Sequence, residues 1–265
     1  MGLLRLVAES QEQGLRLTDL CAMSGLQRPT AHRLLQVLVD ESAIERDGTT
    51  RRYRIGTEML LLGLARPGGL PMRAAADPYL LQLAQRAGDT VFLSLRHGSD
   101  SVCIARHTGH YAIQVLSIEV GVRRPLGASV SGVVLLSGLE APEARALVKA
   151  NEPRLLHHGV ASSQLLRRVQ QARQHGYTFA TSGVMPGTSA MAVPVLGADG
   201  RVLAAISIAA MAHRLARPRT LEVKAMMQDT ATAIGHRLTE LDRARGRRRS
   251  GPLVETASGR RASTR

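Results

Sequence analysis

The stretch of residues 18–55 constrains the fold of this chain more than any other. Thr18 is expected to cap a short helix, because a threonine hydroxyl accepts a free backbone N–H at a helix start. Gly25 is expected to end that helix in the left-handed conformation. A second helix is expected to begin near Pro29, whose missing N–H would have no partner at a first helical position. Two short helices joined by a glycine turn form the helix-turn-helix pattern.

The second of these helices has two distinct sides. At 100° per residue its apolar residues fall on one side, namely Ala31, Leu34, Leu35 and Leu38. The other sides carry arginine, which can bind guanine, and glutamine, which can bind adenine, as in a helix that lies in the DNA major groove. The alternative is a solvated charged face. Our candidate DNA-contacting residues on the two helices are Thr18, Gln27, Arg28, Thr30, His32, Arg33 and Gln36.

A basic hairpin is predicted directly after the second helix. Residues 44–46 and 51–55 have strand character, and the turn between them is Asp-Gly-Thr-Thr. Tyr53 and Ile55 are expected to point one way, with Arg52 and Arg54 pointing the other. Such a hairpin is a wing that touches phosphates, and its candidate contacts are Arg46, Arg52 and Arg54.

The segment GLQRPTAHRLLQVLVD resembles a signature of the IclR (isocitrate-lyase regulator) family of bacterial transcription factors, Gly-Leu-x-[Lys/Arg]-x-Thr-x-His-Arg-Leu-Leu. The matching residues are Gly25, Leu26, Arg28, Thr30, His32, Arg33, Leu34 and Leu35. Pro29 stands where the family usually has serine. A weaker resemblance continues to about residue 240. It implies a winged helix-turn-helix domain followed by a GAF-like domain that senses a small molecule.

Length and composition suit two domains of ordinary size. We place the DNA-binding domain with its linker helix at 1–66, a Pro-Gly hinge at 67–71, the sensor at 72–242 and a basic, disordered tail at 243–265. The tail holds half of the net charge of +14, so the net charge supports DNA binding only weakly. The stronger support is the position of the arginines on the second helix and the wing. No transmembrane run or secretory signal is evident, which predicts a cytoplasmic protein without a membrane partner. The two cysteines are expected to be free buried thiols.

The segment EMLLLGLA, residues 58–65, is apolar almost all round. Left exposed it would be a liability, so burial against a second copy is expected, and the resemblance also implies a dimer through this region. A two-fold assembly, homodimer or homotetramer, would match a palindromic operator. The alternative is burial against the chain's own second domain.

The pattern after the hinge predicts an α+β domain with one antiparallel sheet flanked by helices. Helices are expected at 72–87, 128–138, 141–150, 162–175 and 218–243. Strands are expected at 91–95, 102–106, 112–118, 189–196 and 201–209.

The resemblance also implies a set of effector-pocket residues. They are Ile113, Leu116, Arg124, Val130, Ser131, Ala180, Ala190, Ser207 and Ala209. Three positions that are polar in relatives are alanine here, so we predict an organic acid larger or more apolar than glyoxylate or pyruvate. Arg124 is a candidate partner for its carboxylate, since a guanidinium suits two oxygens, and a helix start nearby offers free N–H groups. The alternative is that Arg124 is exposed beside Arg123.

Other classes of function find less support in the sequence. The segment GASVSG lacks the spacing of a nucleophile elbow, and His107 and His110 have no evident third metal ligand. We therefore assign no catalytic residue, metal or cofactor. The alternatives to a ligand-controlled DNA-binding regulator are a sensor or dimerisation module with a weakened DNA domain and, last, an enzyme of small organic acids.

Overall fold

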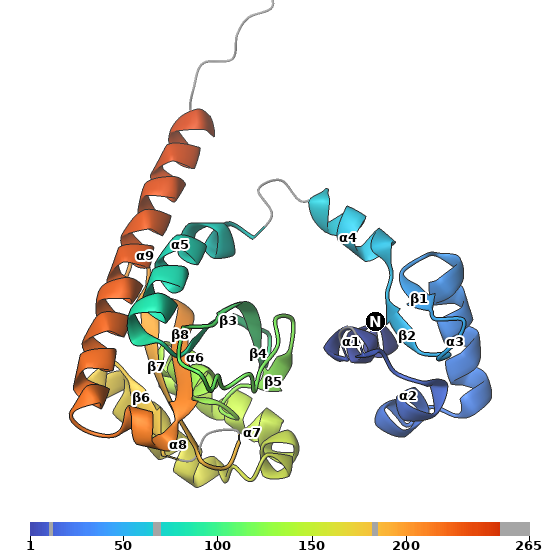
Figure 1. Ribbon diagram of the computed structural model, residues 1–265, viewed down its shortest axis with the longest axis horizontal. Coiled ribbons are helices and arrows are strands. Elements are labelled where there is room, and N and C mark those ends of the chain that lie inside the picture. The colour runs from blue at the N-terminus through green and yellow to red at the C-terminus, as the bar shows by residue number, and fades with distance from the viewer. Residues whose placement is uncertain (11–12, 66–69, 182–184, 250–265) are drawn as a thin grey trace, which may run out of the picture.

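The computed structural model describes residues 1–10, 13–65, 70–181 and 185–249. The N-terminal domain consists of α1 (Gly2–Glu9), α2 (Leu17–Ser24), α3 (Arg28–Asp40), β1 (Ile44–Arg46) and β2 (Tyr53–Ile55), and α4 (Thr57–Leu64) follows it. Each domain has its own core (Figure 1). Within the described chain no helix combines the length and the apolar character that crossing a membrane requires.

The core of the N-terminal domain joins all three helices to the hairpin. Val7 of α1, Leu20 of α2 and Leu35 of α3 are fully buried there. The turn between α2 and α3 contains Gly25 at φ +70°, the left-handed conformation predicted for it. β1 and β2 pair antiparallel, and Leu15 adds a bridge to Tyr53 on the far side of β2. The predicted winged helix-turn-helix is therefore confirmed.

The start of α2 differs from the prediction. The helix begins at Leu17, and the cap position is Arg16 rather than Thr18. The Asp19 carboxylate accepts the Arg16 backbone N–H at 2.9 Å. An acidic side chain in the first helical turn also complements the helix dipole, so Asp19 takes over the role that the sequence assigned to the threonine.

The C-terminal domain is built on one six-stranded antiparallel sheet. Its strand order is β5-β4-β3-β8-β7-β6, with α5 and α9 over one face and α6, α7 and α8 over the other (Figure 1). The helices are α5 (Pro71–Ala87), α6 (Val130–Ser137), α7 (Ala141–His157), α8 (Ser162–His175) and α9 (Arg219–Arg249), with a 3₁₀ turn η2 (Ala212–Leu215). The strands are β3 (Thr90–His97), β4 (Asp100–His107), β5 (Arg123–Pro125), β6 (Thr178–Ala180), β7 (Thr188–Leu196) and β8 (Val202–Met211).

The predicted layout differs from the structure in four respects. The strand expected at 112–118 is wrong, because this segment is a loop, and both edge strands, β5 and β6, were missed. α7 is seven residues longer than expected. α9 continues to Arg249, so 243–249 is helical rather than part of a disordered tail. Residues 67–69 of the predicted hinge and 250–265 of the tail lie outside the described residues.

A buried carboxylate, that of Asp89, ties the start of β3 to η2 and to the start of α9. Asp89 is 1% exposed, and its oxygens accept hydrogen bonds from Arg214 and Arg219, each at 2.7 Å. The Arg214 guanidinium also stacks over the Tyr111 ring, 3.7 Å from its centroid. Asp89 thus holds η2 and the first turn of α9 against the end of α5.

We expect Asp89→Ala to lower the free energy of unfolding by about 3–5 kcal/mol, because it leaves two partly buried guanidinium groups without a counter-charge. The control is Asp199→Ala, which removes an exposed pair with Arg201 and should cost less than about 1 kcal/mol. Urea denaturation followed by circular dichroism measures both. Equal effects of the two substitutions would contradict the role of Asp89.

Candidate functional site

The exposed side of α3 carries the polar residues that the sequence singled out. Ala31 and Leu35 are buried against the domain core, while Leu34 is 45% exposed, so the apolar side is narrower than expected. The predicted contact residues of this helix and its cap, and Thr18 on α2, are all exposed: Gln27, Arg28, Thr30, His32, Arg33, Gln36 and Thr18. Gln36 is partly engaged, since its amide donates to Asp40 at 2.8 Å. Arg28, His32 and Arg33 are exposed and available to contact a binding partner.

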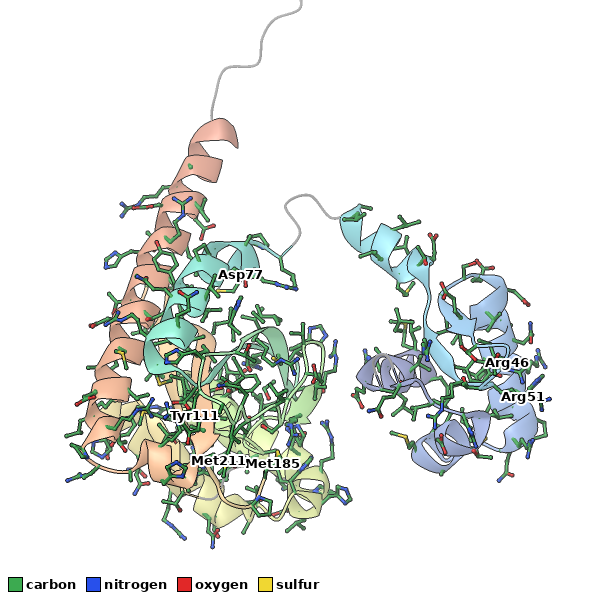
Figure 2. The ribbon with its side chains drawn as sticks, viewed as in Figure 1. Arg46, Arg51, Asp77, Tyr111, Met185 and Met211 are labelled. Atoms are coloured by element: carbon green, nitrogen blue, oxygen red, sulfur yellow. The ribbon has the colours of Figure 1, made fainter. Side chains whose placement is uncertain are left out.

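The wing is shaped by one aspartate. The Asp47 carboxylate accepts the Thr50 N–H at 2.6 Å, the Thr50 hydroxyl at 2.8 Å and the Thr49 N–H at 3.1 Å. The hydrogen bonds from Thr50 lower the pKa of this carboxyl. The folded turn ends at Arg51 in the left-handed conformation, at φ +55°. Arg46 and Arg51 project from the hairpin in Figure 2, and both are exposed.

The arginines predicted to line the wing have different surroundings. Arg52 is half-buried, and its guanidinium donates to the Gly14 carbonyl at 2.8 Å, which ties the wing to the loop before α2. Arg54 is exposed with its guanidinium 4.0 Å from Asp47. Arg46 lies over the Tyr53 ring at 5.8 Å. Arg51, which was not among the candidate residues, is also exposed, and its place at the end of the turn could have suggested it.

α4 has no buried residue although most of its side chains are apolar. Its four leucines are 52–71% exposed: Leu60, Leu61, Leu62 and Leu64. The beginning of the helix is fixed to the wing, because Glu45 accepts hydrogen bonds from both the N–H and the hydroxyl of Thr57 at 3.1 Å. Within the described chain, the leucines of α4 therefore form an apolar surface that the chain's own second domain does not cover.

A cavity of about 370 Å³ lies between the sheet and the helices α6 and α8. Its size falls within the ~300–1,000 Å³ range of small-molecule sites. Seven of the nine predicted effector residues line it: Arg124, Val130, Ser131, Ala180, Ala190, Ser207 and Ala209. The cavity is also lined by polar residues that the sequence did not single out as pocket residues, namely Ser117, Ser129, His158, Arg168 and Thr188. About half of the residues that line the cavity are therefore polar.

Ile113 and Leu116 do not line the cavity, which corrects their assignment. They are 54% and 49% exposed on the loop that replaces the predicted strand. The loop is held by Gln114, whose amide donates to the carbonyls of Gly88 and Tyr111 and accepts from the Thr90 hydroxyl. The resemblance placed both residues in the pocket, but the loop that Gln114 holds leaves their side chains exposed.

Arg124 is half-buried in this cavity, and its hydrogen-bonding groups are incompletely paired. One terminal nitrogen donates to the Ser117 carbonyl at 3.3 Å, while its buried Nε has no hydrogen-bond partner among the described residues. Burial lowers the pKa of the guanidinium. The alternative that Arg124 is a surface residue is therefore wrong. A buried donor without a partner is costly, and an anion in the cavity would satisfy it.

The small side chains of the cavity come from the strands and from the start of α6. Ser129 caps α6 by accepting the Gly132 N–H at 3.2 Å. Ser131, in the first turn, donates to the Ser207 hydroxyl at 2.9 Å in the cavity wall. Ala180, Ala190 and Ala209 lie on neighbouring strands in one register. Alanine at these positions leaves the space that larger polar side chains would fill.

Other chemistry finds no support among the described residues. No group of three or more His, Cys, Asp or Glu could hold a metal ion there. His107, one of the two histidines with metal-like spacing, instead contacts Asp77 of α5 at 3.0 Å; Figure 2 marks that residue. Cys103 is buried, Cys21 is half-buried, and both are free.

Comparisons with known proteins agree with this architecture. The family model described as "IclR helix-turn-helix domain" matches residues 1–48, and the one described as "Bacterial transcriptional regulator IclR C-terminal" matches residues 68–236. The chain is 27% identical to the HTH-type transcriptional regulator XynR of Escherichia coli K12 over 86% of this chain and 91% of that protein. It is 28% identical to the glycerol operon regulatory protein of Streptomyces coelicolor over 89% and 93% of the two chains.

Solved structures share the fold. A putative IclR transcriptional regulator from Silicibacter sp. superposes with a TM-score of 0.69 at 22% identity, over 85% of this chain and 89% of that one. An IclR homologue from Microbacterium hydrocarbonoxydans, crystallised with 4-hydroxybenzoate, superposes with a TM-score of 0.68 at 22% identity, over 89% and 97% of the two chains.

Proposed function

This chain belongs to the IclR family of bacterial transcriptional regulators, and from that premise we propose that an organic acid in the C-terminal cavity controls its binding to operator DNA. The relatives are transcriptional regulators and not enzymes, and this chain is likewise a regulator and not an enzyme. The observation that carries the proposal is the exposed polar side of α3, with Arg28, His32 and Arg33 unpaired within the described chain beside a basic wing. We place its action in the cytoplasm, where operator DNA lies.

In the proposed complex α3 lies in the major groove. Its N-terminal residues would reach base edges, and Arg33 would bind a base or a phosphate. Arg46, Arg51 and Arg54 of the wing would bind phosphates, while Arg52, which is bonded to Gly14, would position the wing.

The effector would occupy the cavity with its carboxylate at Arg124. The unsatisfied Nε of Arg124 and the absence of acidic side chains among the described lining residues support an anion. The volume supports an acid larger than glyoxylate or pyruvate, and the homologue crystallised with 4-hydroxybenzoate suggests aromatic acids as probes. A gel shift with the DNA upstream of the chain's own gene, with and without such acids, tests the proposal. Absence of any shift at low salt in every condition would refute it.

We expect Arg33→Ala to lose about 1–3 kcal/mol of discrimination between the operator and unrelated duplex, because an arginine–base contact has this value. Arg5→Ala on α1 is the control, since Arg5 is exposed but lies on another helix. Fluorescence anisotropy at one fixed salt concentration measures both duplexes. If Arg33→Ala discriminates as well as the Arg5 variant, Arg33 does not read the operator.

We propose that the leucine surface of α4 joins two copies of the chain, as a homodimer or within a homotetramer. Leu61→Glu should shift the protein towards monomer and weaken binding to a two-half-site operator, because a charge would have to be buried at the contact. Leu156→Glu on α7 is the matched control, since Leu156 is 60% and Leu61 52% exposed. Sedimentation equilibrium gives the masses. A Leu61 variant with the parent's mass would place the interface elsewhere.

We expect the affinity for benzoate to rise as the pH falls from about 8 to 6. Burial, and then the charges of Arg124, His157 and Arg154, lower the pKa of His158, so its imidazole is neutral at pH 7. A carboxylate bound beside it stabilises the protonated form and raises that pKa. Binding therefore takes up a proton, which becomes easier at lower pH.

Calorimetry at both pH values measures this effect. His158→Gln should remove the pH dependence, while His157→Gln should keep it because His157 does not line the cavity. An unchanged pH dependence in the His158 variant would show that another group takes up the proton.

A further inference from the structure

The cavity contains a second arginine, which the sequence analysis did not identify as a pocket residue. Arg168 lies on α8, is half-buried and lines the cavity. With the rest of the described chain it makes no hydrogen bond and no ion pair. Its neighbour Arg167 on the same helix is exposed and does not line the cavity. Two adjacent arginines are thus placed differently, and the one at the cavity has no partner among the described residues.

The charge of the cavity is therefore unbalanced. Arg124 and Arg168 bring two positive charges, and the described lining residues include neither Asp nor Glu. The sequence of residues 182–184, which lie outside the described chain, is Ser-Gly-Val and contains no acidic residue. Burial lowers the pKa of both guanidinium groups, which reflects the cost of keeping a cation away from water. A ligand with two negative charges would offset that cost at both sites.

The two arginines approach the cavity from opposite edges of the sheet. Arg124 belongs to β5, one edge strand, whereas α8 contacts β6, the other edge strand. Strands β4, β3, β8 and β7 lie between these two edges of the sheet. The two arginines therefore reach the cavity from different sides and are separate binding points rather than one cluster.

We propose that the effector is a dicarboxylate that binds one carboxylate at Arg124 and the other at Arg168. This inference rests on the proposed function, in which the cavity takes an organic acid. The body of the ligand would lie over Phe92, Ala190 and Ala209, which form the apolar floor between the two cations. A phosphate ester places its charges on one group, so it fits two separate cations less well.

Calorimetry with pairs of acids of one skeleton tests the inference on the full-length protein. The pairs are benzoate with terephthalate and hexanoate with adipate, and phenyl phosphate is the compact dianion. We expect one of the dicarboxylates to bind at least about tenfold more tightly than its monocarboxylate partner, since one added charged hydrogen bond has that value. Phenyl phosphate should bind more weakly than that dicarboxylate.

Three variants assign the effect to particular residues. Arg168→Gln should lose the preference for the dicarboxylate and change monocarboxylate affinity less than about threefold, while Arg167→Gln should behave as the parent. Arg124→Gln should weaken both acids of a pair. The thermal midpoint of ligand-free Arg168→Gln should not fall, because a buried unpaired charge is removed, so loss of binding cannot be attributed to unfolding.

The outcomes separate this inference from the proposed function. Equal affinity within both pairs, an unchanged preference in Arg168→Gln, or tighter binding of phenyl phosphate would overturn the dicarboxylate while the organic-acid site stands. If no acid of either pair binds, the proposal that the cavity takes an organic acid is wrong, and the dicarboxylate inference that rests on it is wrong as well.

Discussion

The close packing of α6 against the middle of the sheet is the contact on which the C-terminal cavity depends. All residues of α6 from Val130 to Leu136 are buried, so the helix is covered on every side. Glycine permits this close packing, because a Cβ on Gly138, at the end of α6, would lie 2.4 Å from the Val202 side chain of β8, and one on Gly132 would lie 2.5 Å from the Gly127 nitrogen. This packing brings the start of α6 over the strands, where Ser131 meets Ser207. The helix start, the strand alanines and the arginines then enclose one space.

The domain treats its buried charges in two ways. Asp89 brings two arginines together, and its carboxylate satisfies both, which is how a folded protein normally retains buried ions. Burial lowers the pKa of Arg124 and of Arg168, and the described residues that line the cavity include no carboxylate to pair with them. The contrast lies within one domain and therefore does not reflect its general composition. This contrast supports the proposal that Arg124 and Arg168 bind an anion.

The sequence predicted the parts of the structure that follow from local periodicity. The apolar side of α3, Gly25 and the alternation of the wing led to the correct winged helix-turn-helix, since one short segment carries each signal. The predictions from sequence failed where contacts between segments far apart in the sequence determine the structure. Gln114 holds residues 112–118 as a loop through bonds to Gly88 and Thr90, which no local pattern reveals. Arg168 enters the cavity because α8 packs on α6, a contact between segments about 30 residues apart.

The attachment of α4 to the wing has a consequence for how the two domains can communicate. Gly56 donates its N–H to Ala43 at 3.0 Å, and a Cβ there would lie 2.1 Å from the Ser42 carbonyl oxygen, so the chain leaves the wing in one direction. Glu45 then holds the first residue of α4. A partner seated on the leucines of α4 would therefore fix the position of the wing, and with it α3, which contacts β1. In the proposed dimer, a change that ligand binding makes in the pairing of two α4 helices would reach the proposed DNA-contacting residues through this joint, without deformation of the helix-turn-helix itself.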